Sequence, residues 1–115
     1  MIQQMDNSYG LIYKITNTIN GKYYIGKKCL NKGKKWEKYW GSSKDLQADI
    51  KQYGVEHFTK DILIYCNNSY ELSYYEIEYM IRYNWLSDKC YNQNMSGRYY
   101  KSKLNNTNEN RNSNL

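Results

Sequence analysis

The stretch YGLIYKITNTINGKYYIGKK, residues 9–28, decides the fold because it places two runs suited to β-strands on either side of a turn. The runs are Tyr9–Thr16 and Lys22–Lys27, both rich in β-branched and aromatic residues. Asn20-Gly21 lies between them and supplies the positive φ angles that a hairpin turn requires. The stretch predicts an antiparallel hairpin, and the wide loop NTINGK leaves its register open by a residue or two.

The segment after the hairpin predicts a basic element followed by a helix. Lys32–Trp40 concentrates lysines and two tryptophans, which indicates a short basic helix or loop with stacking character. The next segment, KDLQADIKQYG, follows the serine pair at residues 42 and 43 and ends at Gly54. Serine favours the first position of a helix and glycine its end, so a helix is predicted between them.

The remaining pattern predicts a strand and a long helix. Val55–Tyr65 reads as the strand, and a helix is expected from Ser69 to about Trp85, capped by Asn68 together with Glu71. The order of elements predicts an α+β fold in one domain of residues 1–100. Residues 101–115 are rich in asparagine and poor in apolar side chains, so they are expected to form a disordered polar tail.

The charge of the chain favours an anionic partner. The sequence has 17 Lys and Arg against 11 Asp and Glu, a net charge of +6, and nucleic acid is the expected partner. It has no apolar run long enough to cross a membrane and no signal-peptide pattern, so we expect a cytoplasmic protein that does not bind membranes. The three cysteines show no C-x-x-C pairing and are expected to be reduced thiols.

Two tyrosines of the predicted hairpin have a distinctive setting. Tyr13 ends the run GLIY, and Tyr24 begins the run YIG. Tyrosines that merely pack across a hairpin would give the same spacing. The whole stretch, however, resembles the signature of the GIY-YIG nuclease superfamily, with one extra residue in the first element. The resemblance extends over residues 9–95 and is greatest for bacteriophage homing endonucleases. It implies a small three-stranded antiparallel sheet flanked by helices.

The resemblance implies a metal ligand on the long helix. The family holds a single divalent cation on a helix glutamate, and Glu76 fits that position, with Glu71 and Glu78 as nearby alternatives. Mg²⁺ (or Mn²⁺) keeps most of its waters and needs only one protein carboxylate. A glutamate bonded to the tyrosines around it would be the structural alternative.

The resemblance also assigns roles to the hairpin. Tyr13 would orient or deprotonate the attacking water, and Tyr24 would support the phosphate or a water by hydrogen bonding. A tyrosine has an ordinary pKa of about 10, so Tyr13 would need a cationic environment to act as a base. Lys27 matches a family lysine that could provide this environment, although it could also be a solvated lysine.

The chain departs from the family at its arginine. The family has an arginine about ten residues beyond the YIG tyrosine and a histidine or tyrosine four residues later on the same helical face. Here Lys35 and Tyr39 keep that spacing, and Arg82 or Arg98 are alternative sources of the charge. Lysine offers a point charge in place of a bidentate fork, so weaker activity is one expected consequence.

Two further residues complete the sequence assignment. Asn92 matches a late family asparagine that ties the active-site elements together, although a turn residue would look the same. His57 lies outside the family's catalytic positions and is expected on the face of a strand. The residues expected to bind the DNA backbone are Lys28, Lys32, Lys34, Lys38 and Lys44.

These observations predict a metal-dependent DNA endonuclease. Because we expect no separate DNA-binding region after the catalytic residues, we expect it to nick with loose specificity. The alternative is a non-catalytic nucleic-acid-binding module on the same fold. If the chain comes from a phage, it would act in the cytoplasm of the host cell. The sequence leaves the oligomeric state and the target sequence open.

Overall fold

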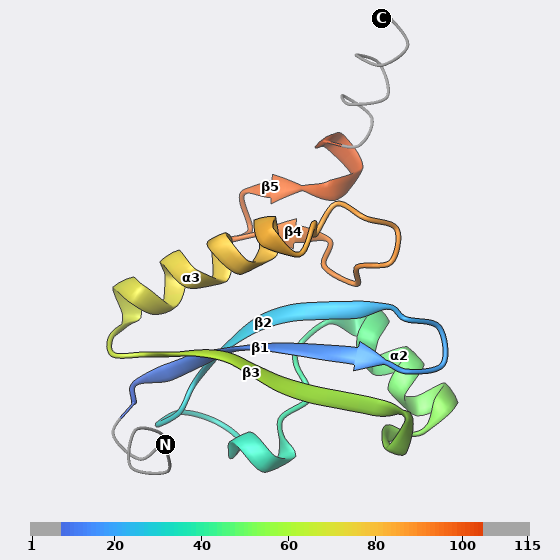
Figure 1. The fold of residues 1–115 in the computed structure, drawn as a ribbon, viewed down its shortest axis with the longest axis horizontal. Coiled ribbons are helices and arrows are strands. Elements are labelled where there is room, and N and C mark those ends of the chain that lie inside the picture. The colour runs from blue at the N-terminus through green and yellow to red at the C-terminus, as the bar shows by residue number, and fades with distance from the viewer. Residues whose placement is uncertain (1–7, 105–115) are drawn as a thin grey trace, which may run out of the picture.

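The computed structural model of the protein describes residues 8–104 (Figure 1). A three-stranded sheet is followed by a long helix and a short hairpin. In chain order the elements are β1 (Gly10–Asn17), β2 (Tyr23–Cys29), the 3-10 helix η1 (Trp36–Lys38), α2 (Lys44–Tyr53), the 3-10 helix η2 (Val55–His57), β3 (Phe58–Cys66), α3 (Ser69–Arg82), β4 (Asn94–Met95) and β5 (Tyr99–Tyr100). The predicted α+β fold with a three-stranded antiparallel sheet is confirmed.

The sheet has the order β2-β1-β3, so β1 is central and β2 is an edge strand. The predicted hairpin is confirmed: β1 and β2 pair antiparallel, with Tyr13 opposite Gly26 and Ile15 opposite Tyr24. Gly21 has a φ of 79°, the positive value expected in this turn. Because opposite residues share a face, Tyr13 and Tyr24 both belong to the face that carries Ile15.

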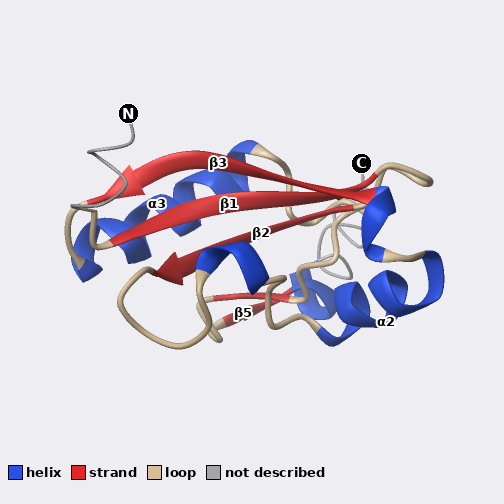
Figure 2. Cartoon of the chain, turned by 90° about the horizontal axis from the view of Figure 1, so that it is seen from below, coloured by secondary structure: helices blue, strands red, loops and turns tan. Residues whose placement is uncertain are grey.

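The two faces of the sheet are covered by different elements. Helix α3 covers one face, and α2 and η1 lie against the other (Figures 1 and 2). The core under α3 includes Ile12, Ile25, Leu72, Met80 and Trp85. The core on the other face includes Leu11, Tyr13, Ile15, Leu46 and Phe58. A sheet buried on both faces explains why the hairpin strands read as nearly continuous apolar runs.

The helix caps agree with the sequence analysis. The Ser43 hydroxyl accepts a hydrogen bond from the Leu46 amide (3.2 Å), and the Asn68 side chain accepts one from the Glu71 amide (2.8 Å). The long helix ends at Arg82, three residues before the predicted end. In the part of the chain that the structure describes, no helix has the length and hydropathy needed to span a bilayer.

The third strand begins later than predicted. Gly54 leaves α2 with a φ of 95°, and the His57 amide then donates to the Gly54 carbonyl (3.1 Å), which closes a 3-10 turn. The prediction that His57 lies on the face of a strand is therefore wrong. Its ring lies 3.8 Å from the Glu56 carboxylate, outside both clefts described below.

The end of the described chain also differs from the prediction. Residues 101–104 form a helical turn where a disordered tail was expected to begin. The Lys101 side chain is buried and its amine donates to the carbonyl oxygens of Ser87 (3.0 Å) and Cys90 (2.7 Å). These charged hydrogen bonds offset the cost of ordering a polar segment. The rest of the predicted tail, residues 105–115, lies outside the described residues.

Candidate active site

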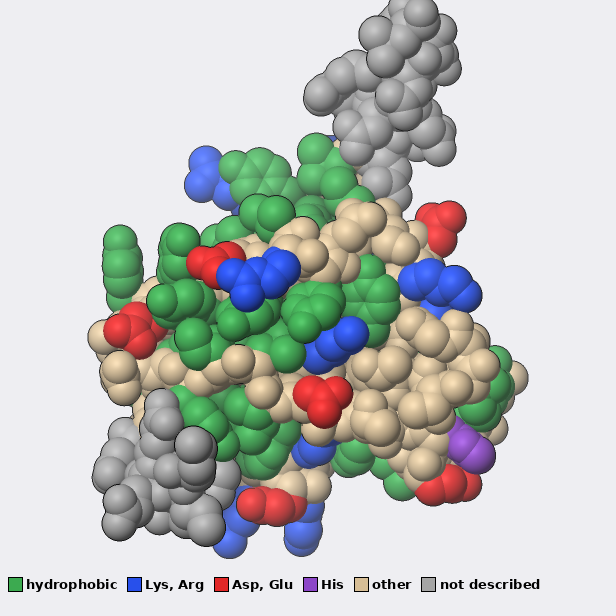
Figure 3. Space-filling view, viewed as in Figure 1, with side chains coloured by type: hydrophobic (Ala, Val, Ile, Leu, Met, Phe, Trp, Pro, Cys, Tyr) green, Lys and Arg blue, Asp and Glu red, His purple; other side chains and the backbone are tan. Residues whose placement is uncertain are grey.

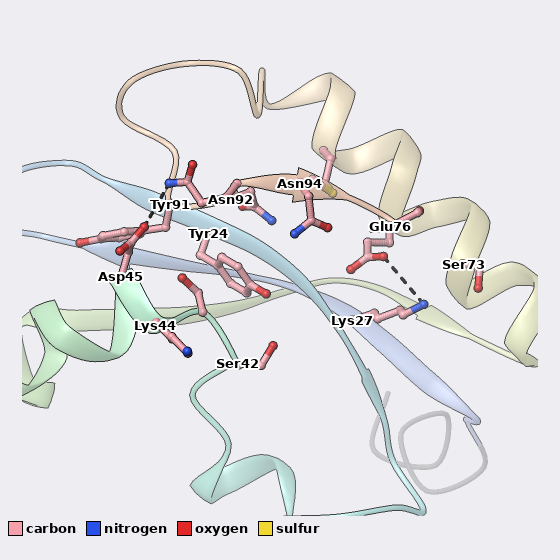
Figure 4. A pocket seen from close by; sticks show the side chains of 14 residues that line it. Tyr24, Lys27, Ser42, Lys44, Asp45, Ser73, Glu76, Tyr91, Asn92 and Asn94 are labelled. Carbon is pink, nitrogen blue, oxygen red and sulfur yellow. Dashed lines mark hydrogen bonds and ion pairs between the residues drawn. The ribbon is translucent and has the colours of Figure 1, made fainter. Parts of the chain in front are cut away.

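A cleft of about 820 Å³ lies beside the edge strand β2 (Figure 4). Its walls come from β2, from the start of α2, from α3 and from the segment that leads into β4. The side chains that define it, from these four elements, include Tyr24, Lys27, Ser42, Lys44, Glu76, Asn92 and Asn94. Residues more than sixty positions apart in the sequence therefore meet at one edge of the sheet.

Glu76 projects from α3 into this cleft. Its side chain is 16% exposed, and its carboxylate lies 3.9 Å from the Lys27 amine (Figure 4). Burial raises the pKa of Glu76, and the Lys27 charge opposes this only in part. The alternative ligands lie elsewhere, because Glu71 accepts the Asn67 amide at the start of α3 and Glu78 pairs with Arg82. Glu76 is the one of the three predicted glutamates that lines the cleft.

The two motif tyrosines have different surroundings. Tyr24 lines the cleft, whereas Tyr13 is 1% exposed and packs within 6.1 Å of the Tyr24 ring, centroid to centroid. Burial first, and then the neighbouring phenols of Tyr24 and Tyr39, raise the pKa of Tyr13 far above its usual range. The Tyr13 phenol is therefore not in the cationic environment that it would need to act as a base.

The pKa of Tyr24 is also raised by burial, while a hydrogen bond with the Ser42 hydroxyl partly lowers it. Both Ser42 and Tyr24 line the cleft. A neutral phenol in this position can donate one hydrogen bond and accept others. Tyr24, and not Tyr13, is therefore the motif tyrosine whose ring reaches the space in front of Glu76.

Asn92 joins the segment after α3 to the edge of β2. Its side-chain oxygen accepts from the Ile25 amide (2.9 Å), and its side-chain nitrogen donates to the Ile25 carbonyl (2.8 Å). Asn92 is 6% exposed and Ile25 is fully buried, so these bonds satisfy strand groups that water reaches poorly. Asn92 therefore links the segment after α3 to β2, a contact that an ordinary turn residue would not make.

A second cleft of about 750 Å³ adjoins the first and shares Lys27 and Ser42 with it. It carries the lysine-rich loop between β2 and α2, and its basic lining residues are Lys27, Lys28, Lys32, Lys34 and Lys38. The predicted DNA-contact residue Lys44 lines the first cleft. Together the two clefts form a path from the lysine-rich loop to Glu76.

Comparison with known proteins identifies the family. The family model described as "Putative endonuclease segE, GIY-YIG domain" matches residues 1–104. The chain belongs to this GIY-YIG family. The resemblance inferred from the hairpin motif is therefore confirmed.

Two proteins of Enterobacteria phage T4 are similar to the chain. "Putative endonuclease segE" is 39% identical over 92 residues, which cover 77% of this chain and 42% of the relative. "Putative endonuclease segD" is 40% identical over 74 residues, or 62% of this chain and 30% of the relative. The chain thus spans less than half the length of these curated relatives. No solved structure matches.

The GIY-YIG arginine position remains the main departure. The loop there contains only the 3-10 turn Trp36–Lys38, so a spacing of four residues does not place Lys35 and Tyr39 on one helical face. Lys35 is exposed and lines neither cleft. Tyr39 lines the basic cleft and meets Tyr13 edge-on at 5.8 Å.

The alternative arginines do not line the clefts either. Arg82 pairs with Glu78 and lies over the Tyr79 ring at 4.6 Å. Arg98 lies over Tyr99 at 5.9 Å on the turn between β4 and β5. Lys27 is therefore the cation closest to Glu76 among the predicted sources of charge.

Lys28 has a different setting from the other lysines predicted to contact DNA. Its side chain is 6% exposed, and its amine donates to the backbone carbonyl oxygens of Cys29 (3.0 Å) and Lys32. It lies 5.1 Å from the Tyr39 ring centroid. Through these contacts Lys28 holds the loop that carries Lys32, Lys34 and Lys38, whose side chains are exposed.

The sequence analysis missed Lys60, which comes from β3. Its amine donates to the carbonyl oxygens of Trp36 (2.6 Å) and Tyr39 (2.8 Å) and lies 3.9 Å from the Trp36 ring centroid. It fixes η1 against the sheet, and burial lowers its pKa. The only sequence signal was a lysine among strand-forming residues, which normally indicates an exposed strand position.

The donor set around Glu76 fits a mostly hydrated cation. Among residues 8–104, no group of three or more His, Cys, Asp or Glu side chains converges on a common point. Mg²⁺ does not need such a group, because waters and substrate oxygens fill most of its coordination sphere. The open cleft in front of a partly buried carboxylate provides the space for those waters. Asn94 also lines the cleft and offers a further amide oxygen (Figure 4).

Proposed function

We propose that this chain is the catalytic domain of a DNA endonuclease that hydrolyses phosphodiester bonds with the help of one Mg²⁺ or Mn²⁺ ion. The observation that supports this most is the placement of Glu76. It is a partly buried carboxylate in a cleft that leads directly into a second cleft lined by lysines. A carboxylate in that position would repel DNA phosphates, so binding alone gives no reason for it.

Glu76 would hold the cation, which when bound supplies positive charge that stabilises the phosphate oxygens in the transition state. Lys27 would add charge to the same phosphate from 3.9 Å away. Tyr24 would orient the attacking water through its hydroxyl, with Ser42 as its hydrogen-bond partner. Tyr13, which is buried and neutral, would position the Tyr24 ring.

The remaining predicted residues would bind the DNA backbone or support the residues of the site. Lys32, Lys34, Lys38 and Lys44 would neutralise backbone phosphates along the two clefts, which makes affinity steeply dependent on salt and largely independent of sequence. Lys35 and Tyr39, on either side of η1, would support the reaction indirectly by holding the lysine-rich loop in place. Nicking with loose specificity, in the cytoplasm of a phage host, is the activity we expect from this domain.

The second candidate is a DNA-binding module without catalysis. The lysine at the arginine position favours it, because lysine cannot make the bidentate contact that an arginine makes with phosphate. The two candidates differ in one measurable property, which is cleavage that depends on Glu76.

The test is relaxation of supercoiled plasmid with Mg²⁺ at low salt, with all variants compared at equal DNA occupancy. We expect Glu76→Gln to lower the nicking rate at least about 100-fold, and Tyr24→Phe to lower it by about the same factor. Glu78→Gln, on the same helix but outside the cleft, is the matched control and should nick like the wild type. Salt-sensitive binding with no metal-dependent nicking by the wild type would establish the binding module instead.

A further inference from the structure

The β4–β5 hairpin forms the outer wall of the Glu76 cleft. Gln93, Asn94 and Ser96 line this cleft, and Figure 4 shows the Asn94 side chain in it. The two strands pair antiparallel and are joined by a turn in which Ser96 and Gly97 have positive φ angles. In Figure 1 the hairpin lies beyond α3, on the far side of that helix from β1 and β3.

The hairpin has one face toward the cleft and one toward the core. Asn94 lies opposite Tyr100, and Met95 lies opposite Tyr99. Opposite residues of an antiparallel pair share a face, so Tyr100 is on the side of Asn94, which lines the cleft. Tyr99 is on the side of Met95, which packs against the core under α3. Tyr100 is 47% exposed and so offers a large aromatic surface on the side of the hairpin that carries Asn94.

The hairpin is basic as well as aromatic. Between Asn94 and Tyr100 the hairpin carries one cation, Arg98, and no Asp or Glu; the Lys101 amine just after it is buried against backbone carbonyl oxygens. Arg98, at the tip, is exposed. The lysine-rich loop lines the second cleft, which adjoins the Glu76 cleft at Lys27 and Ser42, and the hairpin reaches the Glu76 cleft at Asn94 and Ser96. A polyanion laid across both clefts would meet cations of the loop and of the hairpin.

The face that carries α3 lacks this character. Figure 3 shows a broad hydrophobic area there, interrupted by both acidic and basic side chains. Its exposed apolar side chains include Tyr70, Tyr74 and Ile81. Charge complementarity with DNA therefore favours the cleft side of the hairpin over the outer face of α3.

The hairpin is tied firmly to the domain. The Lys101 amide donates to the Gln93 carbonyl (2.8 Å), and the Lys101 amine donates to the carbonyl oxygens of Ser87 and Cys90. The Arg98 amide donates to the Met95 carbonyl (3.1 Å), and the Tyr100 hydroxyl to the Gly97 carbonyl (3.2 Å). A tied hairpin presents its side chains in one geometry and loses little entropy on binding.

We infer that the β4–β5 hairpin is a second DNA-contact arm, in which Arg98 binds a backbone phosphate and Tyr100 packs on a sugar or base beside the scissile phosphate. The inference rests on the proposed function, because it assumes that DNA occupies the Glu76 cleft. It adds a contact to those of the lysine-rich loop, so the DNA would lie across both clefts.

The test measures binding of a fluorescent 30-base-pair duplex to the full chain by anisotropy, in EDTA, over about 50–200 mM KCl. Arg98→Ala should weaken binding and lower the salt slope by about 0.9, the value for one phosphate contact. Arg98→Lys should restore the slope, which shows that charge and not folding is measured. Arg82→Ala, which removes the same charge from the outer face of α3, should leave the slope unchanged.

Tyr100→Ala should weaken binding about 5-fold or more without changing the salt slope, because stacking involves no counterion release. Tyr70→Ala, which removes an exposed tyrosine on the outer face of α3 outside both clefts, should bind like the wild type. Wild-type affinity and slope in Arg98→Ala, or equal losses in Tyr70→Ala and Tyr100→Ala, would overturn the arm while leaving Glu76-dependent nicking intact. Absence of DNA binding by the wild type would instead overturn the proposed function.

Discussion

Asn92 provides a sharp test of the site because its side chain satisfies two buried groups at once. Asn92→Ala would leave the Ile25 amide and carbonyl without their partners at 2.9 and 2.8 Å. An orphaned buried polar group costs about 1–3 kcal/mol, so the two together should lower the free energy of unfolding by about 2–5 kcal/mol. Water entering from the cleft would bring the value to the lower end of this range.

The loss of stability caused by Asn92→Asp should depend on pH. An ionised Asp accepts from the Ile25 amide but cannot donate to the Ile25 carbonyl, whereas a protonated Asp can do both. The loss of stability in Asn92→Asp, relative to the wild type at the same pH, should therefore be smaller at pH 4.5 than at pH 7.5. Burial raises the pKa of such a carboxyl, which brings its protonation into this window.

The assay is urea unfolding of the wild type, both Asn92 variants and Gln93→Ala at the two pH values. Gln93 is exposed, and its side chain bonds only Asp45 at 3.1 Å, so its variant should remain within about 0.5 kcal/mol of the wild type. Two results would refute the reasoning: an Asn92→Ala variant as stable as Gln93→Ala, or an Asn92→Asp deficit that does not shrink at low pH.

Three further predictions concern the same site. Burial raises the pKa of Glu76 above that of an unfolded glutamate, so the ionised carboxylate destabilises the fold at neutral pH. Without metal, Glu76→Gln should therefore have a higher melting temperature than the wild type at pH 7.5. This difference in melting temperature should disappear as the pH falls toward the ordinary glutamate pKa. Lys60→Met should lower the free energy of unfolding by about 1–2 kcal/mol and change the tryptophan fluorescence, because the cation over the Trp36 ring and its two hydrogen bonds to carbonyl oxygens are lost. Unchanged fluorescence emission would contradict the role given to Lys60. Gly26→Ala should cost about 1–3 kcal/mol in urea unfolding, since its methyl group would lie 2.3 Å from the Tyr13 hydroxyl; a variant within about 0.5 kcal/mol of the wild type would exclude this steric explanation.

Local signals predicted the parts of the fold that depend on neighbours in the sequence. Asn-Gly between two β-branched runs predicted the hairpin, and Ser43 and Asn68 predicted the helix starts, because turn and cap geometry involve only a few adjacent residues. The position of Glu76 on α3 followed from the family resemblance. Its approach to Lys27 depends on how α3 crosses the sheet, which no local signal specifies.

Features that depend on distant contacts were missed or misread. Lys28 and Lys60 are cationic and looked exposed, yet each donates to a backbone carbonyl of the β2–α2 loop, that of Lys32 for Lys28 and that of Trp36 for Lys60. A lysine can bury its apolar stem wherever its amine finds such partners, so its burial depends on a loop whose path the sequence does not reveal. The same reason explains why Lys101 was assigned to a disordered tail, although it anchors the last described turn.

The difference between Tyr13 and Tyr24 follows from sheet order. Tyr13 is in the central strand β1, which has β2 on one side and β3 on the other, and η1 and α2 cover the face to which it belongs. Tyr24 is in the edge strand, beside the cleft, so its ring can reach a substrate. The family resemblance predicts that both tyrosines belong to the site, but the pairing of β1 with the distant β3 determines which of them is enclosed. We therefore expect the Tyr13 hydroxyl to act through Tyr24, with Tyr24→Phe the more damaging of the two substitutions in the nicking assay.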